Sequence, residues 1–329
     1  METMKAVRIY SYGGPEVLRY EDAPRPRPGD REILVRVHAA GVNPVDWKAR
    51  EGYLKDLLPY RLPFTPGWDL SGVVEALGPG VVGFRMGDEV YSRPDLARDG
   101  AYADYIVIRA SEAALKPRTL DHIHAAAMPL AALTAWQALF DAADLQEGQK
   151  VLIHGGAGGV GSFAVQLAKW KGAVVAATAS AGNQEFLRDL GADQAVDYRG
   201  SPFEETVCGV DVVLDTIGGE TQKRSWKTLR RGGIMVSTVN PPSDEDALLY
   251  GARKASVWVQ SSARQLAELA ALVDSGELRP FVETILPLAQ ARRAQEISQT
   301  GHARGKIVLR VAPPVTAVWA TVAREAALA

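Results

Sequence analysis

The chain has 329 residues, of which 47% are hydrophobic and 23% are charged, and its formal net charge at pH 7 is −2. This length accommodates about two domains of roughly 150 residues each, and the balanced charge argues against nucleic acid as a partner. The sequence opens without a signal-peptide pattern and contains no apolar run of about 18 residues, so we expect no membrane segment. Cys208 is the only cysteine, which excludes an intrachain disulfide and favours a cytoplasmic location.

Residues 1–122 are predicted to form a first domain of short strands separated by turns. Residues 5–10 and 33–38 are short strand-like runs, in the second of which Ile33, Val35 and Val37 occupy every second position, and residues 105–108 form a short β-prone run. Turns that contain glycine and proline separate these runs. The pattern favours a compact, barrel-like β domain.

Residues 123–262 show a different pattern, in which strand-like and helix-like segments alternate. Residues 123–143 are rich in Ala and Leu and are predicted to be helical, and the βα units that follow begin with a strand at 150–154 and a helix at 158–171. This alternation predicts parallel strands with crossover helices, a doubly wound sheet. The predicted fold class is therefore α/β.

Residues 263–329 are predicted to return to the first domain. The segment includes a helical pattern at 263–274 and a final strand at 305–311, and this strand lies beyond the βα alternation. The tail at 315–329 is compatible with a short helix.

A glycine-rich loop joins the strand at 150–154 to the helix that follows it. Gly155, Gly158 and Gly161 recur at a spacing of three residues, and Gly159 and Val160 lie between the last two. Such a turn lets backbone N–H groups and the positive end of the helix approach a pyrophosphate. These five residues are the predicted contacts to a dinucleotide; a flexible connector is the alternative.

A loop for phosphate transfer is a second alternative, but it requires Gly-Lys-Ser/Thr. Gly161 is instead followed by Ser162 and Phe163.

The end of the second strand of this domain favours NADPH as the cofactor. A cofactor without a 2′-phosphate usually meets an acidic residue about 20 residues past the loop. Residues 177–183 contain no carboxylate, and the first one is Glu185, on the next helix. Ser180 and Asn183 can donate hydrogen bonds to a 2′-phosphate, although they would also be suitable caps for that helix.

Several motifs occur in the order typical of one enzyme family: "GGPEVLRYED", "ILVRVHAAGVNPVDWKAREG", "PFTPGWDLSGVV", "GDEVY", "GAYADYIVI", "AAMPLAALTAWQAL", "EGQKVLIHGGAGGVGSFAVQLAK", "LGADQAVDY" and "GKIVL". The chain thus resembles the medium-chain dehydrogenase/reductase superfamily, in particular its zinc-free quinone oxidoreductase (zeta-crystallin-like) branch. This resemblance implies a GroES-like catalytic domain, a Rossmann domain, a cofactor between them, and a homodimer formed through edge strands of the Rossmann sheets.

The residues that bind zinc in the zinc-dependent members of this family are replaced. Asn43 stands where those members have Cys, and Trp68 stands where they have a His ligand. The cysteine-rich loop that holds a structural zinc is also missing. We therefore expect no metal, since zinc in proteins requires three or four thiolate, imidazole or carboxylate ligands. His122 and His124 form the only close histidine pair and are expected to be solvated.

The resemblance implies roles for a few further residues. It places Asn43 and Tyr53 beside the nicotinamide, where Asn43 would bind the nicotinamide ribose or the substrate oxygen. Tyr53 would donate to the developing oxyanion or pack on the cofactor ring. Thr134 would lie beneath the nicotinamide, and Tyr198 near the 2′-phosphate. Asp46 is expected to fix the local turn.

The chain departs from its relatives at the cofactor phosphate. Many of them carry a Lys after the second strand, where this chain has Asn183. The leading hypothesis is an NADPH-dependent, metal-independent reductase of quinones or α,β-unsaturated carbonyls. An enoyl-thioester reductase and a non-catalytic NADPH-binding module remain as alternatives.

Overall fold

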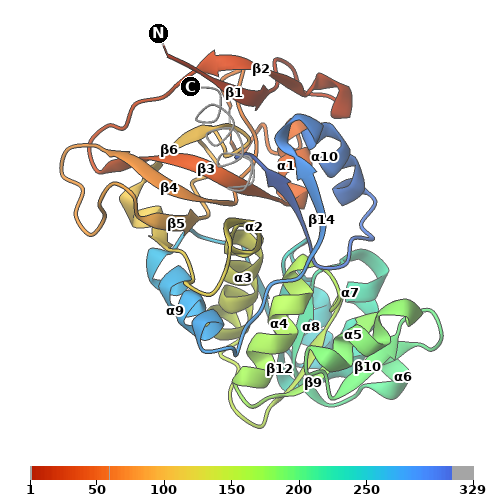
Figure 1. The fold of residues 1–329 in the computed structure, drawn as a ribbon. Coiled ribbons are helices and arrows are strands. Elements are labelled where there is room, and N and C mark those ends of the chain that lie inside the picture. Colours follow the sequence, from red (N-terminus) through yellow and green to blue (C-terminus); the bar gives the residue numbers. More distant parts are fainter. Residues whose placement is uncertain (1, 59, 313–329) are drawn as a thin grey trace. The chain divides into compact units, whose positions relative to one another are not determined.

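The computed structural model describes residues 2–58 and 60–312, and Figure 1 shows the fold. These residues divide into two compact units. The first comprises the residues up to 129 together with 284–301 and 307–312, and the second comprises 130–283 and 302–306. The helix considered for 315–329 lies outside the described residues.

The first unit is built around a sheet of seven strands, in the order β14-β15-β3-β4-β5-β7, with β6 also paired to β3. A separate antiparallel pair is formed by β1 and β2. The strands are β1 (Thr3–Arg8), β2 (Arg19–Pro24), β3 (Glu32–Val42), β4 (Leu70–Leu77), β5 (Glu89–Ser92), β6 (Tyr105–Arg109), β7 (Ala113–Leu115), β14 (Val282–Pro287) and β15 (Lys306–Arg310). The helices are α1 (Pro44–Arg50), α2 (His122–Ala126) and α10 (Ala291–Gln299).

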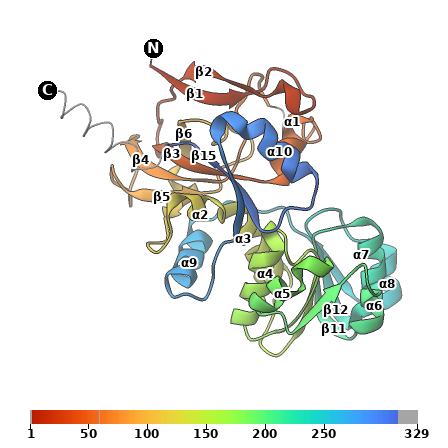
Figure 2. The same ribbon diagram turned by 45° about the vertical axis from the view of Figure 1, so that its right-hand side comes forward.

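The long strand β3 changes its partner along its length. Its first half pairs with β6 and its second half with β15, while β4 pairs along most of its other edge. Figure 2 shows β15 beside β3. This exchange of partners curves the sheet toward the barrel expected of a GroES-like domain.

The second unit is a parallel sheet of six strands in the order β10-β9-β8-β11-β12-β13. This is the strand order of a Rossmann fold, so the predicted doubly wound sheet is confirmed. The strands are β8 (Lys150–Ile153), β9 (Val174–Ala179), β10 (Gln194–Asp197), β11 (Val210–Asp215), β12 (Leu229–Ser237) and β13 (Arg253–Ser256). The helices are α3 (Pro129–Trp136), α4 (Gly159–Trp170), α5 (Gln184–Asp189), α6 (Phe203–Thr206), α7 (Gly219–Ser225), α8 (Asp244–Tyr250) and α9 (Ala263–Asp274).

Residues 263–283 belong to the second unit, although the sequence analysis assigned them to the returning segment. Helix α9 explains this difference. Its Gln265 is buried and hydrogen-bonds Gln137 and Asp141, two residues of the six-residue π-helix that follows α3. Buried polar groups of this kind fix α9 to the second unit, because leaving them unpaired would be costly.

The core of the second unit lies between the sheet and its helices. Leu152, Val213 and Met235 come from β8, β11 and β12 and pack in one buried cluster with Trp226. On α4, the apolar side chains that recur at helical spacing are fully buried, namely Phe163, Ala164, Leu167 and Ala168. Burial of this face fixes the direction in which the N-terminal end of α4 points.

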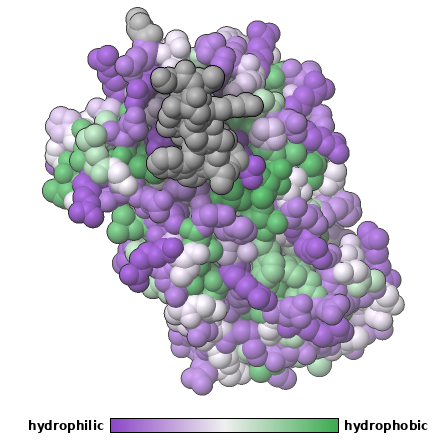
Figure 3. Space-filling model, in the orientation of Figure 1, coloured by the Kyte–Doolittle hydropathy of each residue, from purple (hydrophilic) through white to green (hydrophobic). Residues whose placement is uncertain are grey.

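Figure 3 shows one face of the molecule, coloured by hydropathy. Hydrophilic residues cover most of the face in Figure 3, with smaller green areas between them. Within the described part of the chain, no helix is both long and apolar enough to cross a membrane.

A buried arginine ties the returning segment to the first unit. Arg50, at the end of α1, is fully buried. Its guanidinium donates to the carbonyl of Gly13 at 3.1 Å, to Gln295 Oε1 of α10 at 2.7 Å and to Glu51 Oε1 at 2.5 Å. The guanidinium of Arg50 therefore joins three segments: the loop at Gly13, the end of α1 and the helix α10.

Replacing this arginine tests its structural role. Arg50→Met should lower the free energy of unfolding by about 3–5 kcal/mol, because Glu51 and Gln295 lose their partner. Arg61→Met, at an exposed position, is the control and should change it by about 0.5 kcal/mol or less. Urea unfolding of both variants measures the difference. Equal effects of the two substitutions would contradict the role assigned to Arg50.

Candidate cofactor and catalytic site

The glycine loop connects β8 to α4 in a turn that glycine makes possible. Gly155 has φ = +63°, and a Cβ there would lie 2.7 Å from Thr216 Oγ1. A Cβ at Gly161 would lie 2.1 Å from the carbonyl oxygen of Gly155 and 2.7 Å from the Cα of Gly156. The helix therefore approaches the loop more closely than any side chain would allow.

The N-terminal end of α4 suits an anion. Its N-cap is Gly158, which provides no side-chain cap. The N–H groups of the first turn, at 159–161, have no acceptor within the helix, and the helix dipole makes this end positive. A Cβ at Gly158 would have only one neighbour within 4 Å, the oxygen of Gly155 at 3.3 Å. This geometry fits a pyrophosphate, so the loop residues suit a dinucleotide.

A chain of buried hydrogen bonds positions the loop from behind. Ser225 Oγ donates to Thr221 O and so accepts from His154 Nε2 at 2.8 Å. The proton is thus assigned to Nε2, and Nδ1 accepts from Thr178 Oγ1 at 3.1 Å. Thr178 Oγ1 in turn accepts the N–H of Gly155 at 3.4 Å. His154 links the first glycine of the loop to α7.

A second loop beside the glycine loop was not identified from the sequence. Asp215, at the end of β11, is fully buried. Its carboxylate accepts the N–H groups of Ile217 and Gly218, the side-chain amide of Gln222 and the hydroxyl of Ser237, at 2.8–3.0 Å. An Asp at a strand end before Gly-Gly was the available signal for this loop.

The residues predicted to bind the 2′-phosphate lie together at the ends of β9 and β10. Ser180 directly follows β9, and its hydroxyl oxygen accepts from Asn183 Nδ2 at 3.2 Å. Tyr198 directly follows β10, and its N–H donates to the carbonyl of Ala179 at 3.3 Å. The glycine loop is adjacent, because the backbone N–H of Gly156 donates to the carbonyl of Thr178, near the end of β9. These residues share the carboxyl edge of the sheet, where Rossmann folds bind ligands.

Thr134 lies on α3 of the second unit and is buried. Its hydroxyl donates to Leu130 O, one turn earlier in the same helix, at 2.7 Å. The hydroxyl proton is thus directed to the helix, and the methyl group and the oxygen lone pairs are what Thr134 can offer a ligand.

In the first unit, Asn43 is held in place by two carboxylates. It precedes α1 and is 2% exposed. Its side-chain amide donates to Asp69 Oδ2 at 2.8 Å, and its backbone N–H donates to Asp46 Oδ2 at 2.8 Å. Tyr102 also donates to Asp46 Oδ2, at 2.8 Å. Asp46 therefore holds the turn before α1, and Asp69 fixes the amide plane of Asn43.

Tyr53 lies beyond the other end of α1 and is 69% exposed. Its ring meets that of Trp47 edge to face, with 6.2 Å between centroids. The contact holds the ring while its hydroxyl end stays accessible. Asn43 and Tyr53 thus flank the two ends of one short helix of the first unit.

Trp68 stands where zinc-dependent members of the family have a histidine ligand. It is fully buried, and its Nε1 donates to Arg98 O at 3.1 Å. An indole N–H has no lone pair for a metal, so Trp68 cannot take the place of that ligand. Across residues 2–58 and 60–312, no group of three or more His, Cys, Asp or Glu is arranged to hold a metal ion.

The expectation that His122 is solvated is wrong. Its side chain is 15% exposed, its Nδ1 lies 2.8 Å from Ser71 Oγ and its Nε2 lies 3.3 Å from Glu89. Its ring is 4.2 Å from that of His38. The cause is the packing of α2 against the sheet, which the sequence did not indicate; burial also lowers the pKa of His122. His124, whose side chain is 43% exposed, faces solvent as expected.

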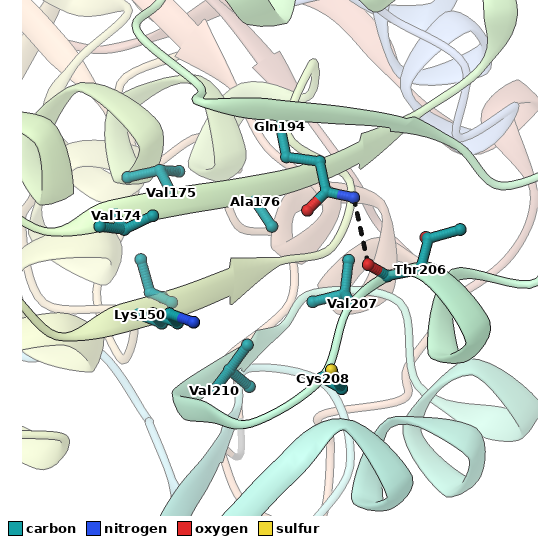
Figure 4. A pocket seen from close by; sticks show the side chains of 10 residues that line it. Lys150, Val174, Val175, Ala176, Gln194, Thr206, Val207, Cys208 and Val210 are labelled. Atoms are coloured by element: carbon teal, nitrogen blue, oxygen red, sulfur yellow. Dashed lines mark hydrogen bonds between the residues drawn. The ribbon is translucent and has the colours of Figure 1, made fainter.

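A hollow of about 220 Å³ lies at the opposite edge of the Rossmann sheet from the glycine loop. Figure 4 shows Lys150, Val174 and Val210 lining it, and these are the first residues of β8, β9 and β11. Cys208 also lines it. Because open α/β sheets bind ligands at the carboxyl ends of their strands, this hollow is not the cofactor site.

Comparison with known proteins agrees with both units. The family model described as "Alcohol dehydrogenase GroES-like domain" matches residues 29–118, and the one described as "Zinc-binding dehydrogenase" matches residues 190–309. The chain is 33% identical to the mitochondrial NAD(P)H oxidoreductase RTN4IP1 of Danio rerio, over 94% of this chain and 91% of the relative. It is 36% identical to the chloroplastic NADPH-dependent alkenal/one oxidoreductase of Arabidopsis thaliana, over 94% and 80%.

A solved structure gives the same result. The quinone oxidoreductase from Coxiella burnetii superimposes with a TM-score of 0.88 at 35% identity, covering 94% of this chain and all of that one. The chain belongs to the medium-chain dehydrogenase/reductase superfamily, in its quinone oxidoreductase branch. The resemblance noted in the sequence is confirmed, and with it the pairing of a GroES-like domain with a Rossmann domain.

The close approach at Gly161 can be tested by adding one methyl group. Gly161→Ala should lower the melting temperature by several degrees, because its Cβ overlaps the backbone of Gly155; overpacking of this kind typically costs about 1–3 kcal/mol. Gly182→Ala is the control, since a Cβ there would have no heavy atom within 4 Å. Thermal unfolding of both variants measures the effect. A Gly161→Ala variant as stable as the control would rule out the close contact.

The buried His154 predicts a loss of stability in acid. Burial lowers its pKa to about 4, whereas an unfolded histidine has a pKa of about 6.5. Between these values only the unfolded chain takes up the proton, so stability falls as pH falls, by about 1.4 kcal/mol per pH unit per proton. In urea titrations from pH 7 to 4, His154→Gln should lose less stability than the wild type. His124→Gln, at an exposed site, should keep the wild-type slope; if both variants keep it, the prediction is wrong.

Proposed function

We propose that this protein is an NADPH-dependent reductase that delivers a hydride to quinones or α,β-unsaturated carbonyls without a metal ion. The observation that carries the proposal is the uncapped N-terminal end of α4, closed against the glycine loop at Gly161. Two relatives are named as an NAD(P)H oxidoreductase and an NADPH-dependent alkenal/one oxidoreductase, and a structural neighbour as a quinone oxidoreductase. These names support the same reaction class.

Two parts of the second unit would hold the cofactor: the glycine loop at the carboxyl ends of the Rossmann strands, and α3. The glycine loop, from Gly155 through Gly158 and Gly159 to Val160 and Gly161, would bind the pyrophosphate with backbone N–H groups. Thr134, on α3, would lie under the nicotinamide. When bound, NADPH supplies the hydride.

Selection of NADPH over NADH is supported by the turn after β9. That turn presents Ser180 and Asn183, and the first carboxylate is that of Glu185, on α5. A carboxylate in the turn would repel a phosphate dianion, whereas hydroxyl and amide groups donate to it. Tyr198 lies beside Ala179, at the end of β9, and would contact the 2′-phosphate from there.

The charge that develops on the acceptor oxygen would be stabilised by hydrogen-bond donors. Asn43 suits this task because Asp69 fixes its amide plane, and a preoriented donor needs no reorganisation during the reaction. Tyr53 presents an exposed phenol beyond α1. Because quinones and enones are already polarised, such donors can substitute for a Lewis acid.

Two further aspects are proposed from the family resemblance and the composition. A homodimer would form through edge strands of the two Rossmann sheets; the edge strands of this sheet are β10 and β13. A cytoplasmic location fits the single, exposed thiol of Cys208.

The test is NADPH oxidation, followed by absorbance, with 9,10-phenanthrenequinone and a simple enone. Turnover should persist in EDTA. Asn43→Ala and Tyr53→Phe should each lower kcat about 10²–10³-fold, the usual loss for one oxyanion donor. Tyr20→Phe, an exposed tyrosine of β2, should match the wild type.

Other outcomes would point to other functions. EDTA-sensitive oxidation of simple alcohols would replace the proposal with a zinc alcohol dehydrogenase. Tight NADPH binding without turnover of any quinone or enone would indicate a cofactor-binding module. Preference for an enoyl thioester would move the substrate to that class, and an unaffected Tyr53→Phe would restrict Tyr53 to packing.

A further inference from the structure

The strands β9 and β10 end side by side at the carboxyl edge of the Rossmann sheet. Asp197, the last residue of β10, is in register with Ala179, the last residue of β9. The next N–H of β10, that of Tyr198, donates to Ala179 O. In Figure 1 both strands lie next to α5. The residues after β10 therefore leave the sheet beside Ser180, the first residue of the turn after β9.

Arg199 is the second residue past β10, and its side chain is exposed. Its guanidinium carbon lies 5.5 Å from the centre of the Tyr198 ring. Among the described residues, no carboxylate is within ion-pair distance of this guanidinium. The backbone N–H of Arg199 donates to Asp197 Oδ1 at 3.1 Å. The carboxylate of Asp197 is therefore directed to the backbone of the turn.

The turn after β9, at residues 180–183, has space beside it for a ligand group. A Cβ at Gly182, within the turn after β9, would have no heavy atom within 4 Å. Ser180 and Asn183 bond to each other across the turn at 3.2 Å. The turn thus offers polar groups and open space but no cation, and a phosphate dianion is held best by a charged donor.

We propose that Arg199 selects NADPH by pairing with its 2′-phosphate, which would lie between the Ser180 turn and Tyr198. This inference rests on the proposed function for the identity of the cofactor. A guanidinium donates two parallel hydrogen bonds to phosphate, and stacking on Tyr198 lowers the entropy lost when it does so. Many relatives carry a Lys after the second strand of the Rossmann domain. In this chain the cation would instead be Arg199, which follows the third strand, β10.

The test compares two ligands that differ only in the 2′-phosphate, namely 2′,5′-ADP and 5′-AMP. Their affinities for the full-length protein are measured by calorimetry, which needs no turnover. Arg199→Ala should weaken 2′,5′-ADP about 10- to 100-fold, the usual effect of a charged hydrogen bond, and leave 5′-AMP within about twofold. Arg199→Lys should recover part of the loss, because it keeps the charge but not the fork.

A matched control removes the same charge elsewhere. Arg231 is exposed near the start of β12, at the amino ends of the strands and away from the carboxyl ends where the cofactor is proposed to bind. Arg231→Ala should bind both ligands as the wild type does. A folded Arg199→Ala variant that binds 2′,5′-ADP within twofold of the wild type would overturn the proposal.

The two proposals fail in different ways. A wild-type protein with equal affinity for both ligands would remove the 2′-phosphate site and, with it, the choice of NADPH. If instead the ligands behave as predicted and no quinone or enone is reduced, the assignment of Arg199 stands and the reductase function falls.

Discussion

The whole site depends on how closely α4 approaches the loop before it. At Gly161 a single added carbon would lie 2.1 Å from a backbone oxygen, so only glycine permits this distance. The approach places the uncapped end of α4 at the carboxyl edge of the sheet, where β8, β9 and β11 end together. The glycine loop, Ser180, Asn183 and Tyr198 all lie along that edge. Burial of the apolar face of α4 fixes the helix direction, and glycine at 161 lets the helix come this near.

Buried polar networks hold the two loops that flank this helix end. His154 connects the glycine loop to α7. Asp215 accepts two hydrogen bonds from the loop after β11, one from Gln222 of α7 and one from Ser237 of β12. In the first unit, Asp46 and Asp69 do the same for Asn43. Asn43 and Trp68 stand where zinc-dependent members of the family have ligands, and both are held by hydrogen bonds. Such prearranged donors suit an acceptor that is already electron-poor.

Much of this arrangement could be predicted from the sequence, because it depends on local pattern. The helix 263–274 has the predicted bounds, and the glycine spacing located the loop. What depends on contacts distant in sequence was missed. The burial of His122 comes from α2 packing on the sheet, and α9 belongs to the second unit because Gln265 bonds to the π-helix. The proposed role of Arg199 depends on the pairing of β10 with β9, which brings it near residues about 20 positions earlier in the chain.

The central claim is that the amide groups at the start of α4 bind the cofactor phosphates. Hydrogen exchange of the full-length protein, with and without NADPH, measures this directly. The account predicts that NADPH slows exchange at residues 158–162, in the turn at 180–183 and in the loop at 216–219. It also predicts unchanged exchange at the hollow around Cys208. Two results would contradict the account. One is unchanged exchange at 158–162 in a protein saturated with NADPH, and the other is protection confined to the amino ends of the strands, around Cys208.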